Sequence, residues 1–426
     1  MPSQLVYGAN QRLPLELPEK CRLAELGASP GAPLSDPAAA SAAAVSDPLE
    51  FPPLTSAAIP GDRVVLTLEH GTPQSRAIIA GIVHVLVQSG VYPSDISIVL
   101  AEHHGGDAFD PTELIDPEYR QAIVVERHDC RVEDSLAYLA ATRDGRPVYL
   151  NRRVCDADVV IPIGVVRHDA QPDYFGVYGS LFPGLTDAET QTRYQSAGDA
   201  RWRAEAQQRR EEAAEAAWLL GVQFTVQVVP AGSDGILHVV AGEAGAVARE
   251  GQRLYRAAWQ AAVADRADLV VATIEGGEEH QTWANVGRAL HAASLVVSNQ
   301  GAIVICCDLH QPPGVALRKA AAPYLPDFEH LFDEDEPLAP SDVEQALSAS
   351  MLSTLLETNR IYLLSRLEEN DVEDLAMAYV EEPSDVARLA GRFEHCLLLA
   401  NSQFVIPTLS NGASNSDREG SAAPSA

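Results

Sequence analysis

The chain has 426 residues, of which 46% are hydrophobic and 21% charged, a composition typical of a globular protein with more than one domain. Its formal net charge of −30 argues against nucleic acid as a partner, because phosphate binding requires a basic surface. No apolar run is long enough to span a bilayer, and the first residues lack the charged and apolar regions of an export signal, so we expect a cytoplasmic protein without a membrane partner.

The first 53 residues predict an N-terminal arm that is partly flexible. Residues 28–53 are rich in Ala, Pro, Ser and Gly and show neither helical nor strand periodicity. From residue 54, apolar runs of strand length alternate with segments of helical spacing, the pattern of βαβ units in a parallel sheet. The pattern predicts a helix over 75–89 and strands over 63–68, 96–101, 122–126 and 159–164.

The rest of the chain repeats this alternation after a charged, Ala-rich helix expected over 199–218. A second βαβ unit comprises a strand over 269–274, a helix over 282–297 and a strand over 302–307. We therefore predict an α/β protein of two domains, each with a mainly parallel sheet flanked by helices and with the active cleft between them. The predicted domains span 54–260 and 261–408, followed by a disordered tail over 409–426.

Histidines and carboxylates follow the predicted strands of the first domain, where ligands bind in open parallel sheets. They are Glu69 and His70 after the first strand, His103, His104 and Asp107 after the second, His128 after the third and His168 after the fourth. A single loop histidine is usually a surface or hydrogen-bonded residue, and a structural role is the main expectation for His128. His103 and His168 directly follow predicted buried strands and are candidates for a functional role.

Two absences from the sequence limit the chemistry. The only lysines are Lys20 and Lys319, so a mechanism with a lysine nucleophile has two candidates. No Gly-rich nucleotide fingerprint and no H-E-x-x-H or comparable metal-ligand spacing is present, so we assign no metal ligand.

A series of motifs lies between Asp62 and about Gly198. Its most specific section contains Thr142, Gly145-Arg146-Pro147-Val148, Asn151-Arg152 and Ala157-Asp158, with His128-Asp129 upstream and Pro183-Gly184 and Glu189-Thr190 downstream. In this order the stretch resembles the N-terminal domain of the nickel-pincer lactate racemase family. The resemblance resumes weakly over 268–308.

The resemblance implies a racemase or epimerase that acts on a small 2-hydroxy acid. In the family, a nicotinate-derived nucleotide is bound through a lysine thioamide and holds nickel, and a histidine completes the coordination. The ring accepts hydride from the carbinol carbon while paired histidines take and return the hydroxyl proton. Carried over to this chain, the acid/base pair is His103 and His168, with His104 as the neighbouring alternative to His103.

The resemblance also implies substrate-binding and cofactor-binding positions. The substrate-binding positions are Glu69, Asn285 and Arg288, of which the last two are spaced to share one helix face. Arg288 is suited to bind a carboxylate through two hydrogen bonds; the alternative is a solvated helix face. The cofactor-binding positions are Thr72, Arg76 and Tyr178.

The sequence departs from the family at the two residues that hold the cofactor. The lysine position falls at Tyr178 or Gly179, neither of which forms a thioamide. The nickel-binding histidine position falls at Tyr194 or Gln195, and neither replaces a neutral imidazole. A pincer nucleotide, if it is used, must be bound noncovalently, and the cofactor is left unassigned.

Three functions stay open at this point. The first is an isomerase of small 2-hydroxy acids with His103 and His168 as the acid/base pair. The second is a divergent protein without pincer chemistry that binds a small anionic ligand, or another metal through His103, His104, Asp107 and His168. The third is a catalytically silent binding protein. The sequence does not indicate the oligomeric state.

Overall fold

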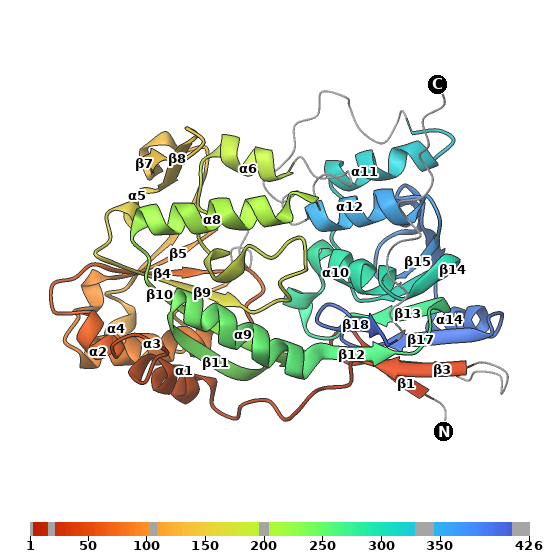
Figure 1. Cartoon of the computed structure of the whole chain (residues 1–426), viewed down its shortest axis with the longest axis horizontal. Helices are drawn as coiled ribbons and strands as arrows, with labels where there is room; N and C mark the ends of the chain where they lie inside the picture. Colours follow the sequence, from red (N-terminus) through yellow and green to blue (C-terminus); the bar gives the residue numbers. More distant parts are fainter. Residues whose placement is uncertain (1–2, 16–21, 102–108, 196–203, 329–344, 411–426) are drawn as a thin grey trace.

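The computed structural model describes residues 3–15, 22–101, 109–195, 204–328 and 345–410. Two six-stranded sheets lie side by side in it, with helices packed around them (Figure 1). The predicted α/β architecture with mainly parallel sheets is thus confirmed. Among the residues described, no helix has the length and apolar character needed to cross a membrane.

The N-terminal sheet has the strand order β11-β10-β9-β4-β5-β6. All neighbouring strands are parallel except β11, which forms an antiparallel hairpin with β10. The strands are β4 (Val64–Leu68), β5 (Ile96–Leu100), β6 (Val124–Arg127), β9 (Val159–Val165), β10 (Phe224–Gly232) and β11 (Gly235–Glu243). The four strands predicted from apolar runs are confirmed, as is the helix between the first two, α3 (Ser75–Gln88).

Helices cover both faces of this sheet. Val64 and Leu66 of β4 belong to the core cluster under α1 and α3, whereas Val65 between them belongs to the cluster under α8. Burial of both faces explains why the strands are apolar throughout. The elements on the α8 side are α8 (Ala206–Leu220), α6 (Ala188–Gln195), α5 (Arg152–Cys155) and the hairpin β7 (Leu136–Ala141) and β8 (Pro147–Asn151). Residues 199–203 of the helix predicted before residue 218 lie outside the described residues.

The C-terminal sheet is parallel throughout, in the order β16-β15-β14-β13-β17-β3. Its strands are β13 (Ala267–Thr273), β14 (Val297–Cys306), β15 (Arg360–Leu364), β16 (Ala378–Val380), β17 (His395–Leu399) and β3 (Arg22–Leu26). One face packs against α10 (Trp283–Ser294), α11 (Val315–Ala321) and α12 (Ala346–Leu355). The other packs against β1 (Ser3–Tyr7), β2 (Gln11–Leu15) and α14 (Pro383–Ala390). The predicted second βαβ unit is confirmed as β13-α10-β14.

Much of the arm predicted over the first 53 residues forms regular elements in the structure. The strands β1, β2 and β3 pack on or complete the C-terminal sheet, beside β17 in Figure 1. Residues 37–46 form α1 (Pro37–Ser46), and the side chain of Asp36 caps it by accepting a hydrogen bond from Ala39 N at 2.9 Å. Alanine has the highest helix propensity, so an Ala-rich run forms a helix once tertiary contacts support it.

Helix α9 (Ala244–Trp259) runs from the N-terminal sheet to β12 (Gln260–Val263), which pairs with β18 (Ile406–Leu409) beside the C-terminal sheet (Figure 1). Tyr255 Oη donates to Phe404 O at 2.6 Å, and Trp259 Nε1 donates to Pro230 O at 2.9 Å. These buried contacts fix the two sheets relative to each other.

Of the tail predicted from residue 409, residues 411–426 lie outside the described residues. The division at about residue 260 stays a prediction.

Candidate active site

A cavity of about 140 Å³ lies between the two sheets. The N-terminal half lines it with the loops after β4 and β9, which carry Glu69 and Arg167, and with Asp173. The C-terminal half contributes the turn η4 (Glu278–His280) and the first turns of α10, including Asn285 and Arg288. The cavity therefore lies beyond the carboxyl ends of parallel strands, where the cleft was expected.

Two buried arginines border this cavity. Arg167 Nη1 donates to Glu69 Oε1 in a close ion pair. Arg288 Nε donates to Asp173 Oδ2 at 2.8 Å, and its Nη1 donates to Asn285 Oδ1 at 2.5 Å. The Nη2 groups of both arginines have no hydrogen-bond partner among the described residues. The site thus contains guanidinium donors that remain available to a ligand.

The two guanidinium groups repel each other. Burial lowers the pKa of Arg288, and the positive charge of Arg167 lowers it further against the attraction of Asp173. Burial also opposes the charge of Arg167, but Glu69 and then Asp173 outweigh burial and raise the pKa of Arg167. The carboxylates of Glu69 and Asp173 balance these two positive charges.

The carboxylates of the site are held unequally. Glu69 Oε2 accepts a hydrogen bond from Val165 N at 3.2 Å, in addition to the ion pair with Arg167. Asp173 Oδ1 is buried and has no hydrogen-bond partner within the described chain. A buried acceptor without a donor costs about 1–3 kcal/mol. Asp173 is therefore the less firmly held of the two carboxylates.

His70, which follows β4, lines this cavity, whereas neither histidine of the predicted acid/base pair is found there among the described residues. His103, with His104 and Asp107, lies outside the described residues. His168 does not line the cavity; its Nδ1 accepts from Ala170 N at 3.2 Å, and its Nε2 lies 3.4 Å from Asp169 Oδ1. Burial lowers the pKa of His168, and the charge of Arg256 adds to this against Asp169. The pairing of His103 with His168 stays a prediction.

His128 has the structural role that the sequence suggested. The ring is buried, and its Nε2 donates to Thr186 O at 2.8 Å. Its Nδ1 accepts from Asn151 Nδ2 at 3.3 Å. Both ring nitrogens are therefore occupied, and this histidine is committed to the fold.

The three predicted cofactor-binding residues do not line the cavity. Thr72 Oγ1 donates to Glu69 O at 2.8 Å and stabilises the turn after β4. Arg76 pairs with Glu113 at 3.0 Å and covers the ring of Phe109. Tyr178 is half-buried, and burial raises the pKa of its hydroxyl. Their role in cofactor binding stays a prediction.

The residues present do not fit a covalently held pincer nucleotide. No lysine among the described residues lines the cavity, and Gly179, one of the two candidates for the lysine position, borders it with no side chain. Tyr194, one candidate for the nickel-ligand position, is buried and donates its hydroxyl to Glu212 Oε2 at 2.7 Å. The cavity of about 140 Å³ is also smaller than the ~300–1,000 Å³ usual for larger ligands.

Sequence reasoning missed three residues at this cavity. Arg167 directly precedes His168, and no sequence pattern indicated that the arginine, and not the histidine, lines the cavity. Asp173 lies in a segment without strand or helix periodicity, so no pattern singled it out. His280 follows β13 by one turn, and a census of the residues after that strand would have found it.

Comparison with known proteins identifies the fold and the N-terminal domain. Residues 7–203 match the lactate racemase N-terminal domain. The lactate racemase apoprotein from Thermoanaerobacterium thermosaccharolyticum superposes with a TM-score of 0.74 at 15% identity, over 96% of this chain and 100% of that chain. A crystal structure of a protein from Thermotoga maritima superposes with a TM-score of 0.60 at 14% identity, over 89% and 99% of the two chains.

No sequence among the curated proteins matches the chain significantly. At these identities the likeness to solved structures shows the fold alone. The family predicted from the sequence is nonetheless confirmed by the match of the N-terminal domain. Residues 7–203 match the model of the lactate racemase N-terminal domain, and the chain as a whole has the lactate racemase fold.

Proposed function

We propose that the protein binds a small 2-hydroxy acid in the cavity between its two sheets and isomerises it as a racemase or epimerase. The observation that carries the proposal is the pair of buried guanidinium groups, Arg167 and Arg288, which border one small cavity and keep N–H donors without partners. A guanidinium group matches a carboxylate in geometry and charge. The carboxylate of the substrate also relieves the repulsion between the two arginines.

Asn285 positions Arg288 for this contact. Its Oδ1 accepts from Arg288 Nη1 at 2.5 Å, and its Nδ2 donates to His280 O at 2.8 Å. The backbone contact fixes the orientation of the amide, so its oxygen faces the arginine. Asp173 thus holds the Nε of Arg288 and Asn285 holds its Nη1, so Nη2 is left for the substrate.

The size of the cavity limits the substrate to a small acid. About 140 Å³ accommodates a ligand of several non-hydrogen atoms. Glu69 lines the same cavity and offers carboxylate oxygens to a substrate hydroxyl. A 2-hydroxy acid combines the two groups that these residues recognise, a carboxylate and a neighbouring hydroxyl.

Inversion at the carbinol carbon requires a proton-transferring group on each face of the substrate. In the family the paired histidines act on the hydroxyl proton. Because the residues present do not fit the covalently held nucleotide that accepts hydride in the family, we instead assign the proton transfers at the carbinol carbon to His168 and His103. One group removes the proton from the carbinol carbon, and the other returns a proton to the opposite face, so that no net oxidation or reduction occurs. The lowered pKa of His168 favours the neutral imidazole, the form that accepts a proton.

A second candidate is a protein that binds the same acids without turnover. The observation that favours it is the chemistry of the positions where the family holds its cofactor. Gly179 has no side chain there, and the hydroxyl of Tyr194 is committed to Glu212.

Chiral chromatography of a panel of 2-hydroxy acids, incubated with the protein as single enantiomers, tests the two candidates. We expect loss of optical purity for at least one acid, and His168→Ala should slow it by about 10²–10⁴-fold, the usual contribution of a general acid or base. The surface histidine His310 provides the matched control, and His310→Ala should leave the rate unchanged. Binding without isomerisation would select the second candidate, and isomerisation unaffected by His168→Ala would remove His168 from the mechanism.

A further inference from the structure

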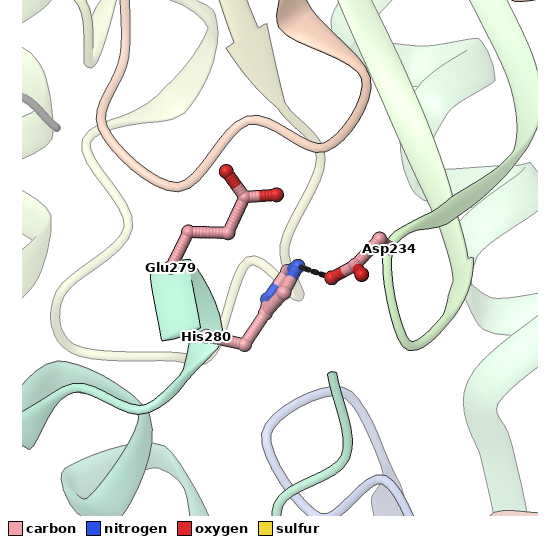
Figure 2. A group of neighbouring side chains, drawn as sticks. All are labelled: Asp234, Glu279 and His280. Atoms are coloured by element: carbon pink, nitrogen blue, oxygen red, sulfur yellow. Dashed lines mark ion pairs between the residues drawn. The ribbon is translucent and has the colours of Figure 1, made fainter. Parts of the chain in front are cut away.

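We propose that Asp234, Glu279 and His280 form a binding site for one divalent transition-metal cation, such as Zn²⁺. Asp234 lies in the turn between β10 and β11 of the N-terminal sheet. Glu279 and His280 lie in η4, which follows β13 of the C-terminal sheet. Figure 2 shows the three side chains gathered around one space, and one potential ligand atom from each lies within 4.8 Å of the others. The site therefore joins the two halves of the molecule.

The imidazole of His280 is the observation that points to a cation. Only 3% of its side chain is exposed, and its Nε2 is directed at Asp234 (Figure 2). The distance from Nε2 to Asp234 Oδ1 is 3.0 Å, yet Nε2 makes no hydrogen bond of acceptable geometry among the described residues. A buried polar atom without such a bond is rare and calls for a partner.

His280 Nε2 and Asp234 Oδ1 lie 3.0 Å apart, and each of the two side chains has a ligand atom within 4.8 Å of a carboxylate oxygen of Glu279. Two ligand atoms that each lie about 2.1 Å from a tetrahedral Zn²⁺ are roughly 3.4 Å apart. The imidazole and the Asp234 carboxylate therefore need to separate by only a few tenths of an ångström to share one ion.

The backbone holds these two ligands in place before any ion binds. Gly277 N donates to Asp234 Oδ1 at 3.1 Å, and Asp234 O accepts from Gln74 Nε2 at 2.9 Å. Gly276 has φ +121°, and a Cβ at this position would lie 2.7 Å from His280 Cδ2. Only glycine allows the ring to occupy its position, so the local sequence is matched to this orientation of the imidazole.

Glu279 supplies the third ligand and leaves room for solvent. Its side chain is exposed, and its carboxylate extends into the space above the imidazole ring (Figure 2). One imidazole nitrogen and two carboxylates suit Zn²⁺ and related cations, with water at the open positions. Mg²⁺ prefers an all-oxygen octahedral shell and is expected to bind weakly. Because Glu279 and His280 also line the cavity, the cation would lie at its border.

Isothermal titration of the metal-stripped full-length protein with Zn²⁺ alone tests the site. We expect one site that prefers Zn²⁺ to Mg²⁺. His280→Gln, Asp234→Asn and Glu279→Gln should each weaken it by at least ~10-fold, since even residues behind the ligands contribute that much to metal affinity. His310→Gln is the matched control, because His310 is exposed and lies 3.6 Å from Glu278 in a similar pair nearby. This control should bind Zn²⁺ as the wild type does.

The melting temperature provides a second readout that also detects misfolded variants. Zn²⁺ should raise the melting temperature of the wild type and of His310→Gln, and not that of Asp234→Asn. The Asp234 and Glu279 side chains are half-exposed and exposed, so their substitution keeps the test valid if the buried His280→Gln variant fails to fold. Absence of Zn²⁺ binding in the wild type, or binding that none of the three substitutions weakens, would overturn the proposal in favour of a plain His–Asp pair.

Discussion

The charge of Asp173 acts on both arginines of the cavity, of which Arg167 is also paired with Glu69. Asp173 forms the ion pair with Arg288, in which each side chain is only 13% exposed, and its charge also stabilises Arg167. In the proposed function, a substrate carboxylate that binds between the arginines would compete with Asp173 for the same positive charges. We therefore expect Asp173 to stabilise the fold and to weaken the binding of small carboxylates.

We expect Asp173→Asn to destabilise the protein and to tighten its binding of small carboxylates. Removal of one partner of a buried ion pair costs about 3–5 kcal/mol of unfolding free energy. Chemical denaturation with and without lactate measures both effects, and lactate should restore part of the loss. The control is Asp158→Asn, whose partner Arg63 is exposed, and we expect it to change stability far less. Equal effects of the two substitutions would show that Asp173 has no special role.

Glu275 makes the stability of the folded protein depend on pH. It lies at the end of β13, and its Oε1 accepts from Asn401 Nδ2 at 2.9 Å. Burial raises its pKa from 4.5 to about 7, against the hydrogen bonds from Asn401. The folded protein therefore keeps a proton on this carboxyl between pH 4.5 and about 7, whereas the unfolded chain releases it. Stability from this group is present at low pH and is lost as the pH rises through this window.

Denaturation midpoints measured between pH 5 and pH 8 test whether stability falls as the pH rises. Glu275→Gln should flatten the decline in stability of the wild type across the window. Glu243→Gln serves as the control of opposite sign. Hydrogen bonds from the backbone of Gly245 and Ala246 lower the pKa of Glu243, so its contribution is lost as the pH falls. If the stability of the wild type rose from pH 5 to pH 7 and Glu275→Gln removed that rise, the raised pKa of Glu275 would be contradicted.

At the level of residues, the family resemblance found part of the site. Glu69, Asn285 and Arg288 were singled out in the sequence, and all three line one cavity. Arg167 and Asp173 were not, because the charge balance of a buried cluster depends on distances between loops that no sequence pattern reports. The catalytic role of His168 stays a prediction; its ring contacts Asp169 and the backbone of Ala170.

Among the elements, the close contact of α1 with α3 depends on one glycine. A Cβ at Gly81 of α3 would overlap Ala38 O and Ser41 Oγ of α1. The same Ser41 Oγ donates to Ile78 O at 3.0 Å, which joins the two helices. The helix pair covers one face of the N-terminal sheet and thereby stabilises its core.

Gly81→Ala tests this contact, because helix propensity and packing predict opposite signs. Alanine favours a helix by about 1 kcal/mol over glycine. Overpacking against a backbone carbonyl typically costs about 1–3 kcal/mol, so we expect a net loss of stability in chemical denaturation. Gly31→Ala, where a Cβ meets only an ordinary contact at 3.4 Å from Leu237, is the control and should not destabilise the protein. A stabilised Gly81→Ala variant would contradict the packing described.

Most of the strands that the sequence predicted are buried on both faces. In β4, β5, β9 and β13 a mainly apolar run indicates a central parallel strand. The edge strand β6 was also predicted, although its residues are exposed or half-buried. The strand β3 was missed because it pairs with β17, from the other end of the chain, and only tertiary contacts stabilise it there. The helix α1 was missed because its Ala-rich composition resembles that of a flexible segment.

In the whole molecule, the site depends on how the two sheets meet. Arg167 and Glu69 come from one half and Arg288 from the other. The buried contacts of Tyr255 and Trp259 fix the position of the two halves relative to each other. The formal net charge of −30 disfavours anions over most of the surface. In the proposed function, the paired arginines of the cavity supply the positive charge that a small acid requires.

The most direct test of the account is isothermal titration of the wild type and of Arg288→Ala with lactate and other 2-hydroxy acids. A lost charge-assisted hydrogen bond costs about 1.5–3 kcal/mol, so Arg288→Ala should raise Kd by roughly 10- to 150-fold. Arg249→Ala, at an exposed pair with Glu50, should bind as the wild type does. A wild type that binds none of these acids, or an Arg288→Ala variant that binds them unchanged, would contradict a carboxylate site between the two sheets.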